Sequence, residues 1–209
     1  MNSRRGNPAP TAANSSPAGE PLADSFEEST VNARRMFRRE VEQLLHHWQS
    51  DGPPPRWRLR EQLKDLKANR QTLGIPSLWA VPPAIVTATL DDGWGHGIET
   101  VALCARALGM TIHPLGLLVP PSEIAAACRR LRPDFLALTV LQVESKEALQ
   151  LITDQVSPVT QVFVGGALVQ SCPQAFNRPN LLAASNLTVF VEQLLRHQAQ
   201  ADGFQSAVG

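Results

Sequence analysis

From residue 84 onward, short apolar segments alternate with segments of helix length, and this alternation restricts the fold more than any other feature of the chain. The apolar segments predict strands at residues 84–90, 111–115, 135–140 and 161–164, with a weaker fifth at 181–184. Amphipathic spacing predicts helices at 98–108, 122–131, 146–155, 168–176 and 187–198. Strands joined by helical connections of this length run parallel, through right-handed crossovers. The sequence therefore predicts an α/β fold built on a doubly wound, five-stranded parallel sheet.

The chain before residue 84 divides into two parts of different composition. Residues 1–28 are rich in Pro, Ala, Ser, Asn and Gly, and they hold too few large apolar side chains to offset the entropy of ordering. Residues 29–83 predict a helical segment with one amphipathic helix from Ser29 and a second over 57–73, separated by a Gly-Pro-Pro-Pro sequence. The predicted organisation is a disordered tail at 1–28, a helical segment or partial cap at 29–83, an α/β domain at 84–200 and a flexible C-terminus at 201–209.

Composition narrows the classes of function. The 19 basic and 19 acidic side chains give a formal net charge of zero, so we expect no direct attraction to nucleic acid or to an anionic membrane. No apolar run approaches the roughly 20 residues that span a bilayer. The three cysteines lack CxxC spacing, which favours buried thiols in a reducing compartment and a cytoplasmic location. No spacing supports a Ser-His-Asp or Cys-His arrangement, so we predict no catalytic residues.

The loop after the first predicted strand is the candidate binding site. It reads Asp91-Asp92-Gly93-Trp94-Gly95-His96-Gly97. In open α/β sheets, ligands bind at the carboxyl ends of the strands. Glycines allow a ligand to approach the backbone closely, and the first amides of the following helix lack partners within the helix.

The sequence of this loop also fits, in part, three other kinds of structure. A tight turn without any ligand uses the same glycines, because every doubly wound fold needs such turns. A dinucleotide site is weakened by the Gly-x-Gly-x-Gly spacing and by the lack of an acidic residue after the second predicted strand. A receiver domain would use paired acids such as Asp91 and Asp92 to bind Mg²⁺, but it needs an aspartate after the third strand, where Thr139 stands.

Residues 87–169 resemble the cobalamin-binding domain of corrinoid proteins, methyltransferases and mutases. Four segments carry the resemblance in the same order. The loop at 92–97 is similar to the family's Asp-x-His-x-x-Gly motif, residues 115–123 to its second strand and next helix, residues 138–141 to its Ser-x-Leu motif, and residues 162–167 to its fourth strand and Gly-Gly turn. The resemblance implies a flavodoxin-like domain with a corrin ring above the strand ends and a nucleotide tail threaded between strand and helix.

Roles for individual residues follow from the resemblance. Thr139 would offer its hydroxyl to the tail, Gly165 and Gly166 would leave room for the tail to pass, and Asp92 would hydrogen-bond the ligand. The implied cofactor-binding residues are Asp92, Gly93, Trp94, Gly95, His96, Gly97, Thr139, Leu141, Gly165 and Gly166.

The sequence also departs from the family pattern. Trp94 stands in the place of the histidine that coordinates cobalt from below, and an indole N–H has no free lone pair for a metal. Either His96 approaches the metal in a remodelled loop, or the cofactor's own base or water lies below the metal while Trp94 stacks on the ring. The segment at 181–186 lacks the family's glycine-rich turn, and two predicted helices stand where corrinoid carriers have a four-helix cap.

The functional expectation is a non-catalytic cobalamin carrier or store, with a methyltransferase as a partner in methyl transfer. An alternative is a regulatory protein that senses cobalamin or haem and acts through a protein partner, which the incomplete cap and the arginine-bearing first helix favour. A third alternative, a scaffold that has lost its ligand, follows from Trp94.

Overall fold

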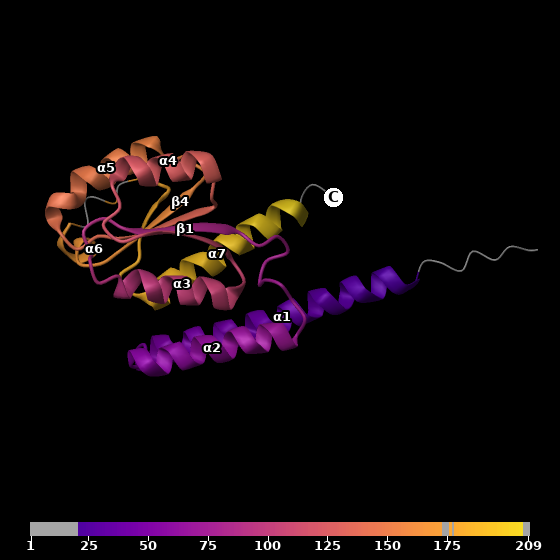
Figure 1. Ribbon diagram of the computed structural model, residues 1–209. Coiled ribbons are helices and arrows are strands. Elements are labelled where there is room, and N and C mark those ends of the chain that lie inside the picture. Colours follow the sequence, from indigo (N-terminus) through magenta and orange to yellow (C-terminus); the bar gives the residue numbers. More distant parts are fainter. Residues whose placement is uncertain (1–20, 173–175, 177, 207–209) are drawn as a thin grey trace, which may run out of the picture.

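The computed structural model describes residues 21–172, 176 and 178–206 of the chain. Five parallel strands form one sheet in the order β2-β1-β3-β4-β5 (Figure 1). Their bounds are β1 Ala84–Thr89, β2 Thr111–Gly116, β3 Phe135–Thr139, β4 Gln161–Gly165 and β5 Leu181–Ala183. The predicted flavodoxin-like, doubly wound, five-stranded sheet is confirmed, and all five strands lie within a residue or two of their predicted positions.

Helices cover both faces of the sheet. Helices α3 (His96–Leu108) and α7 (Leu187–Ser206) cover one face, and α4 (Pro121–Leu131) and α5 (Lys146–Gln155) cover the other (Figure 1). A 3₁₀ turn at Val143–Ser145 precedes α5, and the short α6 spans Leu168–Ser171. β1 and β3 lie inside the sheet and are almost wholly buried, which explains their continuous apolar sequence.

Two helices precede the sheet: α1, Pro21–Asp51, and α2, Arg56–Thr72 (Figure 1). α2 packs against α3, and α1 packs against α2 and α7. The buried side chains of α2 are Leu59, Leu63, Leu66 and Arg70. The apolar residues of α1 and α2 join those of α3 and the sheet in one continuous cluster, so the helical segment is part of the same core.

Some helix bounds differ from the predicted ones. α1 begins at Pro21, before the predicted start at Ser29, and α7 continues to Ser206, beyond the predicted end at residue 198. α6 ends at Ser171, whereas a helix was predicted over 168–176. Residues 1–20, 173–175, 177 and 207–209 lie outside the described residues, so the predicted tail is described only from Pro21 onward. Within the described residues, no helix is both long and apolar enough to cross a membrane.

Arg70 is a buried cation that joins α2 to the end of α3. Its Nε donates to the carbonyl of Ala107 at 3.0 Å, and its remaining N–H groups donate to the carbonyls of Ile75, Pro76 and Arg106. Burial lowers the pKa of the Arg70 guanidinium from its ordinary value. The helix dipole places partial negative charge at the carboxyl end of α3, so a cation is favourable at this position.

Candidate functional site

The carboxyl ends of three adjacent strands lie in register and form the base of the site. Thr89 of β1 pairs with Thr139 of β3, and Thr139 pairs in turn with Gly165 of β4. Thr89 and Thr139 are both buried. The predicted site residues of separate sequence segments therefore meet at one edge of the sheet.

Asp91 joins the loop after β1 to the loop after β3. Its two carboxylate oxygens accept hydrogen bonds from the backbone N–H groups of Leu141 and Gln142, at 2.7 and 2.9 Å. Hydrogen bonds to a charged acceptor are the stronger kind, so this contact restrains both loops.

Thr89 joins the loop after β1 to the loop after β2. Its hydroxyl donates to the carbonyl of Asp92 at 2.7 Å and accepts from the N–H of Leu118 at 2.9 Å. Leu118 has a φ of 53°, an uncommon backbone conformation for a residue with a side chain. Such strain persists where surrounding contacts hold it, and Thr89 supplies one of them.

Asp92 shapes the glycine loop itself. Its Oδ1 accepts from the N–H groups of Trp94 and Gly95, at 2.9 and 3.1 Å. Gly95 precedes α3 with a φ of 67°, a backbone conformation that favours glycine, and a Cβ there would displace the end of the Leu117 side chain, 2.5 Å away. Asp92 is buried and also lines the cavity described next, but one of its oxygens is already used by the loop.

A cavity of about 370 Å³ lies between the sheet, α3 and α7. This volume falls within the ~300–1,000 Å³ range of small-molecule pockets. Seven of the predicted site residues line it: Asp92, His96, Gly97, Thr139, Leu141, Gly165 and Gly166. The structure does not place Gly93, Trp94 or Gly95 on its wall.

The interior of the cavity is mainly apolar and contains two aromatic rings. Phe163 of β4 and Phe190 of α7 meet edge to face, with their centroids 4.9 Å apart and their planes at 76°. Val101, Ala137 and Leu138 add further apolar surface. Both rings are almost wholly buried and belong to the hydrophobic core, so the core itself forms this wall of the cavity.

The two glycines of the Gly-Gly turn differ in their physical role. Gly166 has a φ of 100°, and a Cβ there would lie 2.4 Å from the carbonyl oxygen of Val140, so the fold itself requires glycine. Gly165 has no such backbone constraint, and its Cβ would lie 3.4 Å from the carbonyl oxygen of Ala184. A Cβ at Gly165 would therefore be in van der Waals contact with the end of β5.

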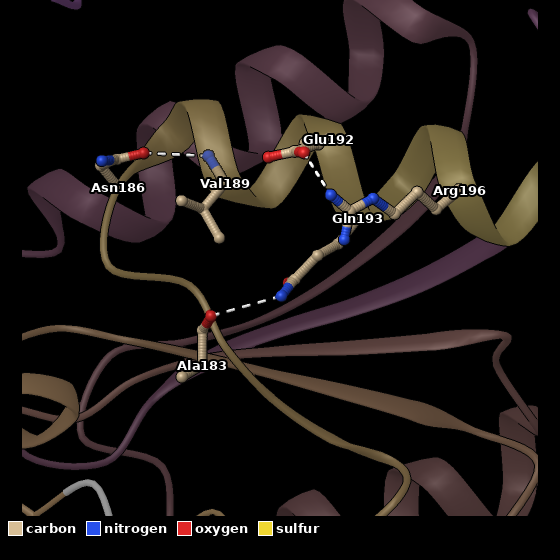
Figure 2. Close-up of polar contacts among 6 residues, drawn as sticks. All are labelled: Ala183, Asn186, Val189, Glu192, Gln193 and Arg196. Atoms are coloured by element: carbon tan, nitrogen blue, oxygen red, sulfur yellow. Dashed lines mark hydrogen bonds and ion pairs between the residues drawn. The ribbon is translucent and has the colours of Figure 1, made fainter. Parts of the chain in front are cut away.

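The start of α7 forms a wall of the cavity that sequence reasoning missed. The Asn186 side chain accepts a hydrogen bond from the N–H of Val189 at 2.9 Å and so caps the helix (Figure 2). The Gln193 side chain donates to the Ala183 carbonyl at 3.4 Å and holds α7 against β5 (Figure 2). Asn186 was the signal in the sequence, because asparagine is a favoured helix-capping residue. Here the capped helix forms the wall, and no glycine-rich turn is present at 181–186.

Trp94 lies on the outside of the glycine loop, whereas the exposed His96 also lines the cavity. Trp94 is 81% exposed, and its ring centroid lies 6.3 Å from that of His96. Other large apolar side chains are exposed on the neighbouring loops. We call these residues together the rim patch: Trp94, Leu117, Leu118, Leu141 and Val143.

Metal ions in proteins are held by groups of side chains, mainly those of His, Cys, Asp and Glu. In the part of the chain that the structure describes, no group of three or more such side chains could hold a metal ion. The three cysteines are buried and free, as the sequence predicted. Burial raises the pKa of the Cys104 thiol to about 12 and that of Cys128 to about 11, so both thiols stay protonated and serve as packing residues.

Comparison with known proteins establishes the fold class. No protein-family model matches the chain, and no curated protein matches it. Among solved structures, the chain is similar to a cobalamin-binding protein from Desulfitobacterium hafniense DCB-2, with a TM-score of 0.63 and 17% identity, covering 83% of this chain and 87% of that chain. It is also similar to the methanol:cobalamin methyltransferase complex MtaBC from Methanosarcina barkeri, with a TM-score of 0.50 and 16% identity, covering 78% of this chain and 65% of that chain. At these identities the comparisons show a shared flavodoxin-like fold.

Proposed function

We propose that this protein binds a corrinoid and acts as a carrier or store for it rather than as an enzyme. The observation that carries the proposal is the position of the cavity: its lining residues Gly97, Thr139 and Leu141 come from the same edge of the sheet as the exposed rim patch. A corrinoid combines a flat macrocycle with a nucleotide tail that ends in an aromatic base. The rim patch would seat the macrocycle, and the cavity would accept the tail.

The chemistry of the cavity suits a tail of this kind. Phe163 and Phe190 offer aromatic contact to a flat heterocycle, and the Thr139 hydroxyl offers a hydrogen bond near the strand end. Exposed apolar side chains that gather on adjacent loops mark surfaces that bind a partner or ligand. The rim patch meets this description, because its members come from the loops after β1, β2 and β3.

The comparisons support the corrinoid over haem. The similar structures are described as a cobalamin-binding protein and as a cobalamin methyltransferase complex, and neither description mentions haem. The haem alternative has no support, and the proposal is restricted to corrinoids. More specifically, we propose that the protein carries the corrinoid in methyl transfer, with a methyltransferase as its partner.

Trp94 replaces a coordinating histidine in this proposal. Its N–H cannot bind a metal, but its exposed ring is free to stack against a macrocycle seated on the rim patch. His96 lines the cavity and carries an imidazole, so it is the candidate metal ligand on this loop. Because Trp94 stands in the place of the coordinating histidine, the loop fits a protein that holds a corrinoid better than a mutase with radical chemistry.

Reconstitution tests the proposal directly. The full chain is incubated with hydroxocobalamin in dim light, passed over a desalting column, and examined by absorption spectroscopy before and after illumination. We expect the corrinoid bands to elute with the protein. A colourless protein fraction would contradict the proposal and would favour a scaffold that has lost its ligand.

Sensing of cobalamin is a second candidate function, because the cavity includes a residue of the helical segment. Arg56, the first residue of α2, lines the cavity beside residues of the α/β domain. A ligand in the cavity would then contact α2 directly through Arg56. A sensor would change its association with a partner protein on loading or illumination, whereas a carrier would accept a methyl group on the bound corrinoid.

A further inference from the structure

Arg56 is the one member of the cavity wall that comes from α2. It follows Pro53-Pro54-Pro55 and lines the same cavity as Thr100 and Val101 of α3. Nothing in the sequence pattern pointed to this position, because the contact depends on how α2 packs against α3.

The first turns of α2 are held in place next to the cavity. Arg60, one turn after Arg56, forms an ion pair with Glu99 of α3, with Nη2 and Oε1 2.6 Å apart. The N–H of Leu59 donates to the carbonyl of Pro55 at 3.0 Å, and the Leu59 side chain is buried. Residues four apart share one helix face, so the contact that fixes Arg60 on α3 also directs Arg56 toward α3.

The charge of Arg56 has no evident structural purpose. A cation in the first turn of a helix opposes the helix dipole, and the first turn of α2 contains no acidic residue. Among the described residues, no carboxylate forms an ion pair with Arg56, and the nearby Glu99 is paired with Arg60. Asp92 also lines the cavity, but its Oδ1 already accepts two backbone N–H groups.

The start of α3 carries partial positive charge, the same sign as the charge of Arg56. The first backbone bond of α3 runs from the N–H of Glu99 to the carbonyl of Gly95 at 2.9 Å, so the N–H groups of residues 96–98 have no partner within the helix. A planar guanidinium is well suited to bind phosphate oxygens in a paired fashion. A group with negative charge is therefore the natural partner for Arg56 in this cavity.

We infer that Arg56 recognises the phosphodiester of a corrinoid's nucleotide tail and makes the protein selective for tailed over tailless corrinoids. This inference rests on the proposed function and adds the class of ligand that the site prefers. The nucleotide tail carries one negative charge in its phosphodiester, whereas a cobinamide lacks the phosphate, the sugar and the base. Selectivity of this kind would depend on a residue outside the α/β domain.

Binding of hydroxocobalamin and of diaquocobinamide to the full chain tests the inference. The variants are Arg56→Gln, Arg56→Lys and, as a matched control, Arg58→Gln, which removes an exposed arginine that does not line the cavity. We expect Arg56→Gln to weaken cobalamin binding about tenfold, or about 1.4 kcal/mol, with cobinamide binding unchanged. Arg56→Lys should lose less, and Arg58→Gln should bind both ligands as the parent chain does.

Salt provides an independent readout. Raising the ionic strength should weaken cobalamin binding to the parent chain more than to Arg56→Gln, because screening acts on the charge pair that the variant lacks. Equal losses for both corrinoids in Arg56→Gln, or no loss for either, would overturn the inference. A parent chain that binds neither corrinoid would instead refute the proposed function, so the two failures are distinguishable.

Discussion

Gly97 and Thr139 face each other so closely on the cavity wall that a Cβ on Gly97 would lie 3.5 Å from the Oγ1 of Thr139. This separation is ordinary van der Waals contact, so the backbone tolerates a side chain at position 97. A long side chain at position 97 would nevertheless fill part of the cavity, because its atoms beyond the Cβ would occupy the space beside Thr139.

Gly97→Leu should therefore separate ligand binding from stability. Leucine improves the intrinsic helix propensity by up to ~1 kcal/mol, so the melting temperature should hold or rise. Corrinoid retention on a desalting column should fall sharply. Gly93→Ala is the control, since its Cβ would meet only Leu118 Cδ1 at 3.9 Å and lies off the cavity wall. Normal retention by Gly97→Leu would show that the ligand does not enter this cavity.

Gly165→Val should weaken both binding and stability. A Cβ at this position approaches the Ala184 carbonyl to 3.4 Å, so a branched side chain would press on the end of β5. Overpacking of this kind costs ~1–3 kcal/mol. Chemical denaturation would measure the stability loss, and reconstitution would measure retention. Unchanged uptake by folded Gly165→Val would remove the tail-threading part of the proposal.

Trp94→His tests whether the glycine loop lies under the metal. Trp94 is 81% exposed, so its replacement should change the free energy of unfolding by less than ~0.5 kcal/mol. In the reconstituted protein, the visible spectrum should shift toward that of an imidazole-ligated corrinoid. Trp94→Phe, which keeps an aromatic ring without a metal-binding nitrogen, should leave the spectrum as in the parent chain. If the histidine variant gives no spectral response, the loop lies elsewhere relative to the ligand.

Arg70→Met should lower the free energy of unfolding by about 2–4 kcal/mol, because it leaves carbonyls at the end of α3 without their charged donor. Urea denaturation measures the loss. Arg130→Met, at an exposed position of α4, is the matched control and should change stability by less than ~0.5 kcal/mol. Comparable stability of the two variants would mean that the Arg70 contacts do not hold α2 to α3.

Alkaline pH should destabilise the fold through its buried thiols. The pKa of Cys104 is raised to about 12 and that of Cys128 to about 11, both by burial, from an ordinary value of 9.0. Stabilisation from these groups is present below pH 9 and is lost as the pH rises from there toward 11–12, because the unfolded chain ionises first. The chain has no tyrosine, which removes one competing alkaline titration. Stability curves between pH 8 and 11 would check this, and a flat profile would contradict it.

Much of the α/β domain could be predicted because each strand has its own local signature. The segments that became β1 and β3 consist of apolar residues and threonine, and burial on both faces is the physical reason. The glycine loop and Thr139 could also be placed together, because parallel strands end at one edge of the sheet. These features depend on short-range pattern and on topology.

Contacts set by packing could not be predicted in this way. Arg56 reaches the cavity only because α2 lies along α3, and no local pattern encodes that arrangement. The hydrogen bonds that Asp92 Oδ1 accepts from its own loop were not predicted, because they depend on the loop's backbone path. The wall at Asn186 was not predicted, because an asparagine helix cap here takes the place of a glycine-rich turn.

The hydrogen bonds from Asp91 to the loop after β3 and from Thr89 to the loop after β2 have a kinetic consequence. Because these loops are already ordered in the free protein, ligand binding needs no slow loop-ordering step. The observed association rate should therefore rise in proportion to ligand concentration without reaching a plateau. Asp91→Ala would free one of these loops, and saturation of the observed rate in that variant alone would reveal the step that the carboxylate normally removes.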